Sequence, residues 1–349
     1  MNPDIYSEIA EKATLSGILI GLSLVVAMYS TWAERKVAAY IQDRKGPDRA
    51  GWGGLLQPLA DGGKLFFKEE ITPAHAEKFL FILGPTIAMT LALMTGAVIP
   101  WSTEFSWGNS VINPLIADIN IGYLYVLGVL SLGVYGMLLG SWASNNKWSL
   151  MGGIRAASQI ISYEIPLGIT LIAVFMISGS LKLDVIVAGQ MDGYWNIVLQ
   201  PIGFVIFLVC CFAETNRTPF DLPEAENELI GGYHSEYSSM KLGFFLFAEY
   251  VNIFITSVLL ATLFFGGYDI PFVNDAKLTE NLGMNTMAVL HFLVLFIKTC
   301  FFIFLFMWVR WTIPRFRYDQ LMDLGWKRLL PLALFNLLIT GFVILYFFN

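Results

Sequence analysis

Long apolar segments alternate with short polar connections along this whole chain. A helix that spans a bilayer needs about 20 mostly apolar residues. Eight segments meet this requirement, at about 14–33, 79–100, 119–142, 158–178, 197–213, 242–265, 287–309 and 329–348. The pattern predicts an all-α polytopic membrane protein with about eight transmembrane helices, in which residues 1–349 form a single membrane domain.

A shorter amphipathic segment lies within the first polar connection, residues 34–78. Apolar residues recur there at helical spacing, with two lysines toward the far end. The residues are Leu55, Leu59, Lys64, Phe66, Phe67 and Lys68. The segment is too short to span a bilayer and predicts an amphipathic helix along the membrane surface. A surface helix that only packs against the protein is the alternative.

The basic residues are distributed unequally between the two sides that an even number of spans defines. The connections after the first, third, fifth and seventh spans hold 17 of the 21 Lys and Arg residues. An excess of Lys and Arg in short connections marks the cytoplasmic side. The expected location is therefore a bacterial inner membrane, crossed several times, with both termini on the periplasmic side.

Composition narrows the classes of function. The chain is 56% hydrophobic and 14% charged, and its three cysteines lie in apolar runs without a C-x-x-C pair. No iron–sulfur or zinc site is therefore predicted from this chain alone. It also lacks a glycine-rich nucleotide fingerprint and the basic, aromatic-interleaved cluster of a nucleic-acid binder. We expect no metal or cofactor bound by the chain itself.

The acidic connection at residues 213–241 is the most informative polar stretch. Residues 213–232 contain five acids and one arginine, Arg217, between two long apolar segments. Ionisable groups at membrane depth are costly and mark an ion path or a ligand site. Some of these acids should hold protons near neutral pH or pair with Arg217. An ordinary solvated loop is the alternative.

The spacing within this stretch predicts a short helix over 222–230. Asp221 and Glu224 have the spacing of a capping box. On such a helix, Glu224 and Glu228 share one face and Glu226 points the other way. Like charges one turn apart repel, more strongly where the dielectric constant is low.

Three further acids are expected in the cytoplasmic half of the bilayer. Glu164 lies in the fourth span, Glu249 lies in the sixth, and Glu214 closes the fifth. From the helical rise, Glu164 and Glu249 lie at similar depths from the cytoplasmic ends of their helices, and Glu214 lies at a shallower depth. If their helices adjoin, they form a lateral line of carboxylates able to carry protons. Pairing with basic residues or with a neighbouring subunit is the alternative.

The remaining candidates are basic or imidazole side chains. Lys298 and His291 lie one heptad apart in the seventh span and share a face. A buried lysine there requires an acid partner or a wet path, and a packing ion pair or a transport role would each satisfy this. His75 and His234 show no metal-ligand spacing and are interpreted as ordinary residues.

Several longer motifs lie on the predicted cytoplasmic side. They are Glu34-Arg35-Lys36, Gln42 to Pro47, Gln57 to Asp61 with Lys64, Gln159 to Pro166, Glu214 to Gly231, Glu236-Tyr237, Arg315 to Leu321 and Gly325-Trp326-Lys327. In this order they resemble the H-subunit family of NADH-quinone oxidoreductase, the respiratory complex I membrane subunit that matches mitochondrial NADH dehydrogenase subunit 1. The resemblance covers nearly the whole chain.

The resemblance implies a membrane subunit of a proton-translocating enzyme that carries no redox centre itself. In that family the subunit joins the hydrophilic arm to the pumping arm and forms much of the tunnel by which quinone enters. Iron–sulfur clusters and FMN are then expected in partner subunits. The expected partners are the hydrophilic quinone-site subunits, small membrane subunits, quinone and membrane lipid. Nucleic acid is not expected.

The resemblance also implies roles for particular residues. The proton-coupling candidates are Asp61, Glu164, Glu214, Glu224, Glu226, Glu228 and Glu249. The quinone-binding candidates are Arg35, Lys36, Gln57, Phe66 and Arg217. The third span departs from some relatives, since it holds no acid and offers only Ser131 and Tyr135 as polar candidates.

Two alternative functions remain open from the sequence. A quinone-independent membrane anchor of an ion-translocating hydrogenase would keep the carboxylates, but it should lose the pattern around Gln57 and Asp61. A stand-alone secondary transporter would often show internal repeats with broken helices. No convincing similarity relates the two halves of this chain.

Overall fold

The computed structural model describes residues 3–107, 110–271 and 275–347. Within these ranges the chain is mostly helical, and its strands form one two-stranded antiparallel hairpin. The α-helices and strands are α1 (Pro3–Ile41), α2 (Gln57–Phe67), α3 (Lys78–Met94), β1 (Phe105–Trp107), β2 (Ser110–Ile112), α4 (Gly122–Ala143), α5 (Lys147–Ser178), α6 (Leu183–Asp192), α7 (Asn196–Leu199), α8 (Pro201–Glu214), α9 (Glu226–Leu229), α10 (Ser239–Phe264), α11 (Asp275–Leu282), α12 (Met284–Thr312), α13 (Tyr318–Asp323) and α14 (Leu330–Phe347). Short 3-10 turns η1 (Trp52–Gly54), η2 (Thr95–Val98) and η3 (Gly232–His234) and a π-helical segment η4 (Leu324–Leu329) lie between them.

The predicted membrane spans agree with the helices. Among the described residues, seven helical stretches are long and apolar enough to cross a bilayer. This confirms an all-α polytopic membrane protein. The fourth predicted span is part of a longer helix, because α5 already begins at Lys147. The Asn146 side chain caps that start by accepting a hydrogen bond from the Trp148 amide at 3.0 Å.

The fifth predicted span is shorter than expected and is divided at Gln200. Its main part, α8, has 14 residues. At 1.5 Å per residue this is about 21 Å, less than the hydrocarbon core of about 30 Å. The Gln200 side chain at the break donates to the Thr340 hydroxyl at 2.5 Å and accepts from Asn336 Nδ2 at 2.8 Å. Side chains of α14 therefore satisfy the polar group that the break buries.

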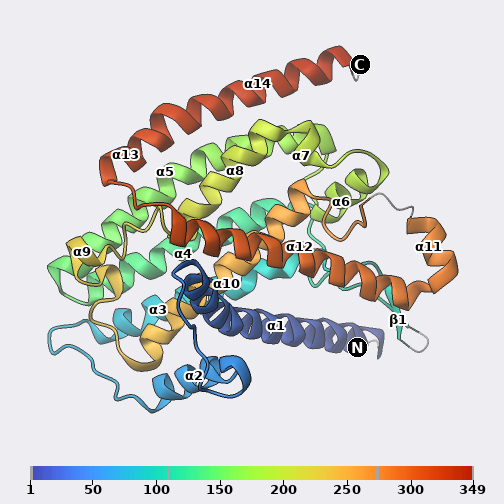
Figure 1. Cartoon of the computed structure of the whole chain (residues 1–349). Helices are drawn as coiled ribbons and strands as arrows, with labels where there is room; N and C mark the ends of the chain where they lie inside the picture. The colour runs from blue at the N-terminus through green and yellow to red at the C-terminus, as the bar shows by residue number, and fades with distance from the viewer. Residues whose placement is uncertain (1–2, 108–109, 272–274, 348–349) are drawn as a thin grey trace.

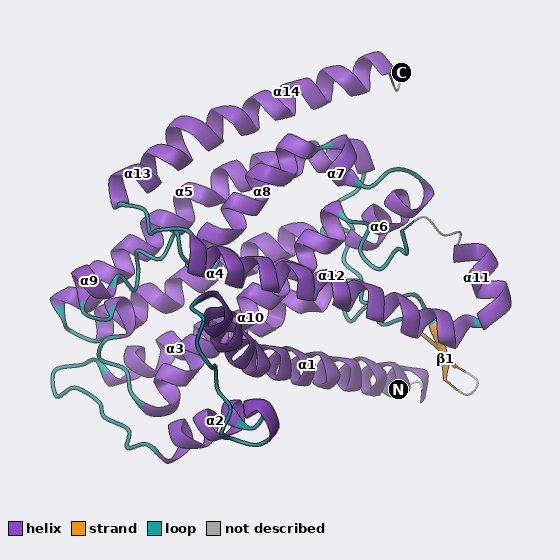
Figure 2. Cartoon of the chain, in the orientation of Figure 1, coloured by secondary structure: helices purple, strands orange, loops and turns teal. Residues whose placement is uncertain are grey.

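The helices define two ends of the molecule (Figure 1). The elements α2, α9 and α13, which follow α1, α8 and α12 in the chain, lie together at one end. The N- and C-terminal regions, β1, α6 and α11 lie at the other end, and long helices connect the two (Figure 2). The arrangement agrees with an even number of crossings.

Helix α10 is the best-enclosed helix of the bundle. Two thirds of its most apolar 18-residue stretch is buried, and the helix packs against α1, α3 and α12. Helices α3 and α4 approach closely at a pair of glycines, because a Cβ on Gly84 would lie 2.7 Å from the Gly140 Cα. The predicted surface helix is α2, which leaves Leu59, Phe66 and Phe67 exposed. Its other face contacts α10, where the Ser239 hydroxyl donates to the Leu65 carbonyl.

Candidate functional site

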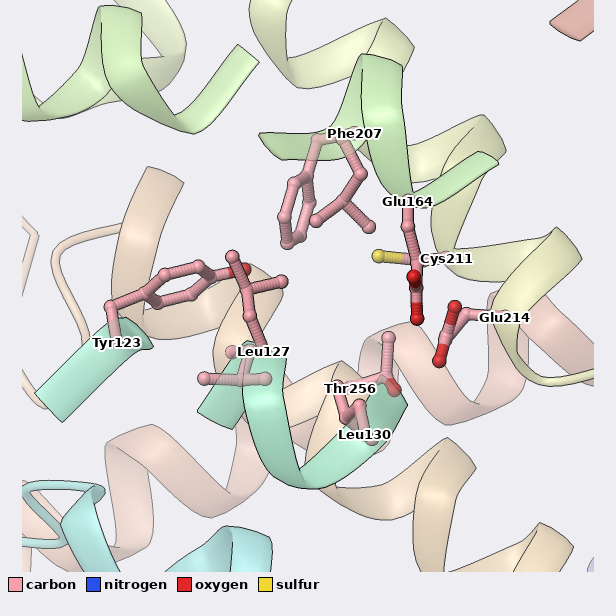
Figure 3. Close-up of a pocket in the computed structure, with 10 residues that line it drawn as sticks. Tyr123, Leu127, Leu130, Glu164, Phe207, Cys211, Glu214 and Thr256 are labelled. Carbon is pink, nitrogen blue, oxygen red and sulfur yellow. The ribbon is translucent and has the colours of Figure 1, made fainter. Parts of the chain in front are cut away.

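Two of the predicted carboxylates face each other across a small internal cavity. Glu164 of α5 and Glu214 at the end of α8 point toward one another, with Tyr123, Phe207 and Thr256 around them (Figure 3). The cavity leaves about 20 Å³ for the centre of a water molecule, which is enough for about one. One oxygen of each carboxylate has no hydrogen-bond partner among the described residues. A carboxyl group in such a place is able to bind water and pass a proton.

A second cavity continues from Glu214 to Glu249 of α10. Asn216, Tyr233 and Asn252 contribute to its lining, and it leaves about 40 Å³ for water centres. Because Glu214 lines both cavities, the order along the path is Glu164, Glu214 and Glu249. The structure thus brings together the three acids for which the sequence predicted a lateral line. Their role in proton transfer stays a prediction.

The third predicted span contributes a hydroxyl to this region and no acid. Ser131 of α4 lies beside the Glu164 carboxyl group. Tyr135, one turn further along α4, has an exposed side chain and points out of the bundle. Of the two polar candidates on this span, only Ser131 reaches the carboxylates.

Glu249 also belongs to a second group of acids. The Tyr233 hydroxyl donates to Glu249 Oε1 at 2.9 Å, and the Glu224 carboxyl group lies within hydrogen-bonding reach of Glu249. A hydrogen bond between two carboxyl groups requires one proton between them. The two carboxyl groups are therefore close enough to share a proton if one is bound there.

His234, which the sequence interpretation treated as ordinary, pairs with Glu224. Its Nε2 atom lies 3.2 Å from Glu224 Oε1. Burial alone raises the pKa of Glu224, but the hydrogen bond and charge of His234 lower it to about 2. Burial lowers the pKa of His234, whereas Glu224 raises it to above the ordinary histidine value. A lone histidine has no motif, so only the fold could show this partnership.

The predicted helix over 222–230 is wrong. The helix α9 is only four residues long, and Glu224 lies in the irregular segment before it. Leu222 and Ala225 are buried, and a Cβ on Gly232 would lie 1.8 Å from the Pro223 carbonyl oxygen. Tertiary packing therefore holds this segment in a loop that local spacing did not predict.

The acids of this loop consequently do not share a helix face. Glu228 is half exposed and forms an ion pair with Arg155 at 2.6 Å. The Glu226 side chain lies outside the described part of the chain. Asp221, instead of capping a helix, binds Arg315. Burial, followed by the charge of Glu224, raises the pKa of Asp221 to about 6 against the opposing effect of Arg315.

Arg217 lies at a buried ionic centre and not on the surface near the other quinone candidates. Its Nη1 atom lies 3.2 Å from Glu34 Oε2, and its Nη2 atom lies 3.9 Å from Glu249 Oε2. Glu34 also binds Arg310 of α12 and accepts a hydrogen bond from the Tyr250 hydroxyl at 2.9 Å. Arg217 therefore connects the line of carboxylates to the end of α1.

Glu34, Arg310 and Tyr250 are site residues that the sequence prediction missed. Glu34 stood in a recognised motif, but its partners come from residues more than 180 positions away. The only local signal was an acid inside a long apolar helix. Such an acid is a candidate by itself.

The remaining quinone candidates gather near the surface. Arg35 follows Glu34 but points to another side of α1, where it pairs with Asp61 at 2.6 Å. Gln57 donates to the same carboxylate at 2.9 Å. Lys36 lies 5.9 Å from the centre of the Trp32 ring. Phe66 is 69% exposed and faces outward from α2. Asp61 thus holds two of the predicted residues together, apart from the buried acids.

A separate polar cluster occupies the opposite end of α10. Lys298 donates to the backbone carbonyls of Phe265, Gly267 and Asp269 at 2.7–2.9 Å. The sequence led us to expect an acid partner or a wet path for Lys298, and three carbonyl groups that follow α10 take the place of the acid partner. His291, on the same face of α12, lies 3.1 Å from Asp275. Within the described ranges, no group of three or more His, Cys, Asp or Glu residues is placed to hold a metal ion.

Comparison with known proteins gives consistent results over nearly the full length. The family model described as NADH dehydrogenase matches residues 13–341. The H subunit of NADH-quinone oxidoreductase from Flavobacterium johnsoniae is 59% identical over 337 residues, covering 97% of this chain and 96% of that protein. The corresponding H 1 subunit from Cytophaga hutchinsonii is 60% identical, with 97% of each chain covered. NADH-quinone oxidoreductase subunit 8 from Rhodothermus marinus is 48% identical, with 94% and 96% covered.

Proposed function

Since this chain belongs to the NADH dehydrogenase family, together with the H subunit of NADH-quinone oxidoreductase, we propose that it lines the quinone-access route and couples quinone reduction to proton pumping. It is a multi-pass membrane subunit of a multi-subunit oxidoreductase complex, and so part of an enzyme. The coupling path is the line of Glu164, Glu214, Glu249 and Glu224.

The observation that carries the proposal is that Glu214 lines both internal cavities. It faces Glu164 in one and shares the other with Glu249. Each cavity has room for water beside carboxylate oxygens, which is what proton transfer between acids requires. A purely structural role would place a cation beside Glu164 and Glu214, and the described lining of both cavities contains no basic residue. Of the three acids, Glu249 alone has a described cationic neighbour, Arg217 at 3.9 Å.

Arg217 is the proposed connection between quinone chemistry and this line. It contacts both Glu34 and Glu249, and its guanidinium lies 4.4 Å from the centre of the Tyr250 ring. Reduction of a nearby quinone changes the local charge and the demand for protons. A change of charge within about 4–6 Å alters the proton affinity of a carboxylate. The buried ionic centre is therefore where the redox event would be transmitted to the acids.

The exposed apolar face of α2 supports quinone access from the membrane. Its Leu59 and Phe66 side chains are exposed. Arg35 and Lys36 lie in the last two turns of α1, and Gln57 lies at the start of α2. The excess of Lys and Arg residues at this end of the molecule favours its location on the cytoplasmic side of a bacterial inner membrane. Iron–sulfur clusters and FMN would belong to hydrophilic partner subunits, and Asp61 would join the coupling path from the quinone side.

The decisive experiment is Glu214→Gln in the assembled complex. Glutamine keeps the shape of the side chain but cannot release a proton, so we expect NADH–quinone turnover and proton pumping to fall about tenfold with normal assembly. The matched control is Glu69→Gln, which changes an exposed acid after α2. Normal turnover and pumping in Glu214→Gln would refute the coupling role.

The quinone part of the proposal has its own test. A photoreactive quinone analogue added to the intact complex should label residues within 34–70. Excess unlabelled quinone should protect them. Labelling elsewhere, with none in this range, would favour a membrane anchor that uses no quinone.

A further inference from the structure

An open basic pocket lies where α1 ends and the chain turns toward α2. Its volume is about 830 Å³, within the usual range of about 300–1,000 Å³ for ligand pockets. The lining residues are Arg35, Arg44, Lys45, Gly46, Pro47, Asp48, Arg49 and Gln57. The pocket is separate from the buried carboxylates and cavities described above.

The loop that forms this pocket is folded back on the protein. A Cβ on Gly46 would lie 3.0 Å from Cδ of Lys36, so the loop packs closely against α1. Gly54 has a φ of +79°, and a Cβ there would lie 2.3 Å from the Pro47 carbonyl oxygen. The Leu56 amide also donates to the Ala50 carbonyl at 3.0 Å. These contacts fix the backbone that carries the basic side chains.

Positive charge in the pocket is only partly compensated. Arg35 is neutralised by Asp61 at 2.6 Å. Among the described residues, Arg44, Lys45 and Arg49 have no carboxylate within 4.0 Å, and the Arg44 Nε atom donates to the neutral Gln42 side chain. Asp48 is the one acid in the described lining. Three cations thus surround a space that one acid does not neutralise.

Large apolar and aromatic side chains flank the same loop. Tyr40 is 87% exposed, Trp52 is 91% exposed and Leu56 is 52% exposed. Tyr40 lies in the last turn of α1, which is the end of a membrane helix. Aromatic residues at this level and basic residues near the surface are typical of contacts with lipid at the membrane interface.

We propose that this pocket binds the phosphate headgroup of an anionic phospholipid. Arg44, Lys45 and Arg49 contact the phosphate, while Tyr40, Trp52 and Leu56 contact the glycerol and the first part of the acyl chains. A free phosphate would use the cations alone, and the exposed apolar side chains would then stay unpaired. An acidic protein segment would need apolar side chains of its own to cover them, whereas one anionic lipid supplies both the phosphate and the apolar chains. Arg35 and Gln57, two of the quinone-binding candidates, also line this pocket, but none of the acids Glu164, Glu214, Glu249 and Glu224 of the proposed coupling path does.

The test uses the intact complex, stripped of lipid in detergent and titrated with labelled phosphatidylglycerol. Each basic residue near an anionic lipid contributes about fivefold in affinity. The variant with Arg44→Gln, Lys45→Gln and Arg49→Gln together should therefore bind about 100-fold more weakly. The matched control replaces Lys147, Lys327 and Arg328 by glutamine, removing the same charge from exposed positions at the same end. The control should bind the lipid normally.

Several outcomes would overturn the proposal. Unchanged phosphatidylglycerol binding by the triple variant would refute the proposed site. If glycerol phosphate bound as tightly as the lipid, and with the same sensitivity to the variant, the ligand would be a free phosphate. Normal lipid binding with loss of the hydrophilic subunits would assign the loop to a protein partner. Should the triple variant not assemble, Arg49→Gln alone should still weaken lipid binding about fivefold, and no change would refute the site.

Discussion

The two ends of α10 both bury polar groups but treat them differently. In the half of the helix nearer Ser239, Glu249 shares a cavity with Glu214 and Asn252, and atoms of the latter two have no hydrogen-bond partner among the described residues. At its other end, Lys298 donates to three carbonyls, and Asn196 donates to the Leu263 carbonyl at 2.8 Å. The first, which we call the acid-lined end, leaves hydrogen-bonding capacity beside space for water. At the second, which we call the saturated end, the Lys298 ammonium group makes its full three hydrogen bonds, although Asp275 Oδ1 nearby lacks a partner among the described residues.

This difference separates groups that can act from groups that hold the fold. A buried polar atom without a protein partner costs free energy, so a native protein keeps it for a reason such as a proton path or a bound water. A fully satisfied network instead fixes one arrangement of the chain. Both clusters contain ionisable residues at membrane depth, and charge alone therefore does not identify the functional one.

The largest expected effect is at the ionic centre that borders the acid-lined end. Glu34→Gln leaves Arg217 and Arg310 without their shared carboxylate. Removing one partner of a buried ion pair costs about 3–5 kcal/mol. We expect a lower thermal stability of the complex together with a loss of quinone-dependent turnover. Glu77→Gln, which changes an exposed acid at the same end, is the control. Unchanged stability would show that the two arginines do not depend on Glu34.

A substitution at the saturated end should lower the stability of the protein without changing turnover. Lys298→Met removes three donors to the carbonyls at the end of α10. Hydrogen bonds from a charged group contribute about 1.5–3 kcal/mol each, and partial compensation by water leaves an expected loss of about 3 kcal/mol. The melting temperature should fall, while turnover per assembled complex stays normal. Lys182→Met, which removes an exposed ion pair with Asp118, should change little. A selective loss of pumping in Lys298→Met would erase the distinction between the two ends.

A glycine pair tests whether the loop geometry, and not only its acids, sustains the acid-lined end. Gly232 has a φ of +62°, and a Cβ there would lie 1.8 Å from the Pro223 carbonyl oxygen. We expect Gly232→Ala to cost about 2 kcal/mol and to displace Glu224 from His234. Gly231→Ala is the matched control, because a Cβ there would lie 3.6 Å from its nearest neighbouring atoms. Equal stability and turnover of the two variants would contradict this account.

The sequence predicted the membrane helices well because their signal is local. Twenty apolar residues in succession specify a span whatever they pack against. The helix over 222–230 failed because the buried Leu222 and the contact between Gly232 and Pro223 outweigh a capping pattern. Tertiary contacts of this kind leave no trace in local spacing.

The acids of the site could be predicted from the sequence, but the residues that pair with them could not. Glu164, Glu214 and Glu249 were identifiable because carboxylates are rare in apolar segments. The pairing of Glu34 with Arg310, 276 residues away, depends on how α1 and α12 pack. His234 differs from any other isolated histidine only through its contact with Glu224. Partner identity is a property of the fold, whereas the cost of a buried charge is visible in the sequence.

The smallest expected effect is the pH dependence of the pair between Glu224 and His234. Because the pKa of His234 is raised in the folded protein, its stabilising contribution is complete below the unfolded value of about 6.5 and is lost as pH rises through the folded value. The lowered pKa of Glu224 gives a contribution that is present above about 4.5 and is lost as pH falls toward 2. The pair should therefore stabilise the protein most between about pH 4.5 and about pH 6.5.

Hydrogen exchange of the amides in 224–234, corrected for intrinsic rates, measures this dependence. Protection should decrease by less than about 1 kcal/mol as pH rises above 6.5, and His234→Gln should abolish the decrease. Asp221→Asn serves as the control, because the pKa of Asp221 is about 6 and this carboxyl group, still about one quarter protonated at pH 6.5, also titrates near this range; the decrease should persist in this variant. If wild-type protection stayed flat across this range, His234 would not be charged beside Glu224. The contrast between the acid-lined end and the saturated end would then rest on the cavities and on the acids that line them.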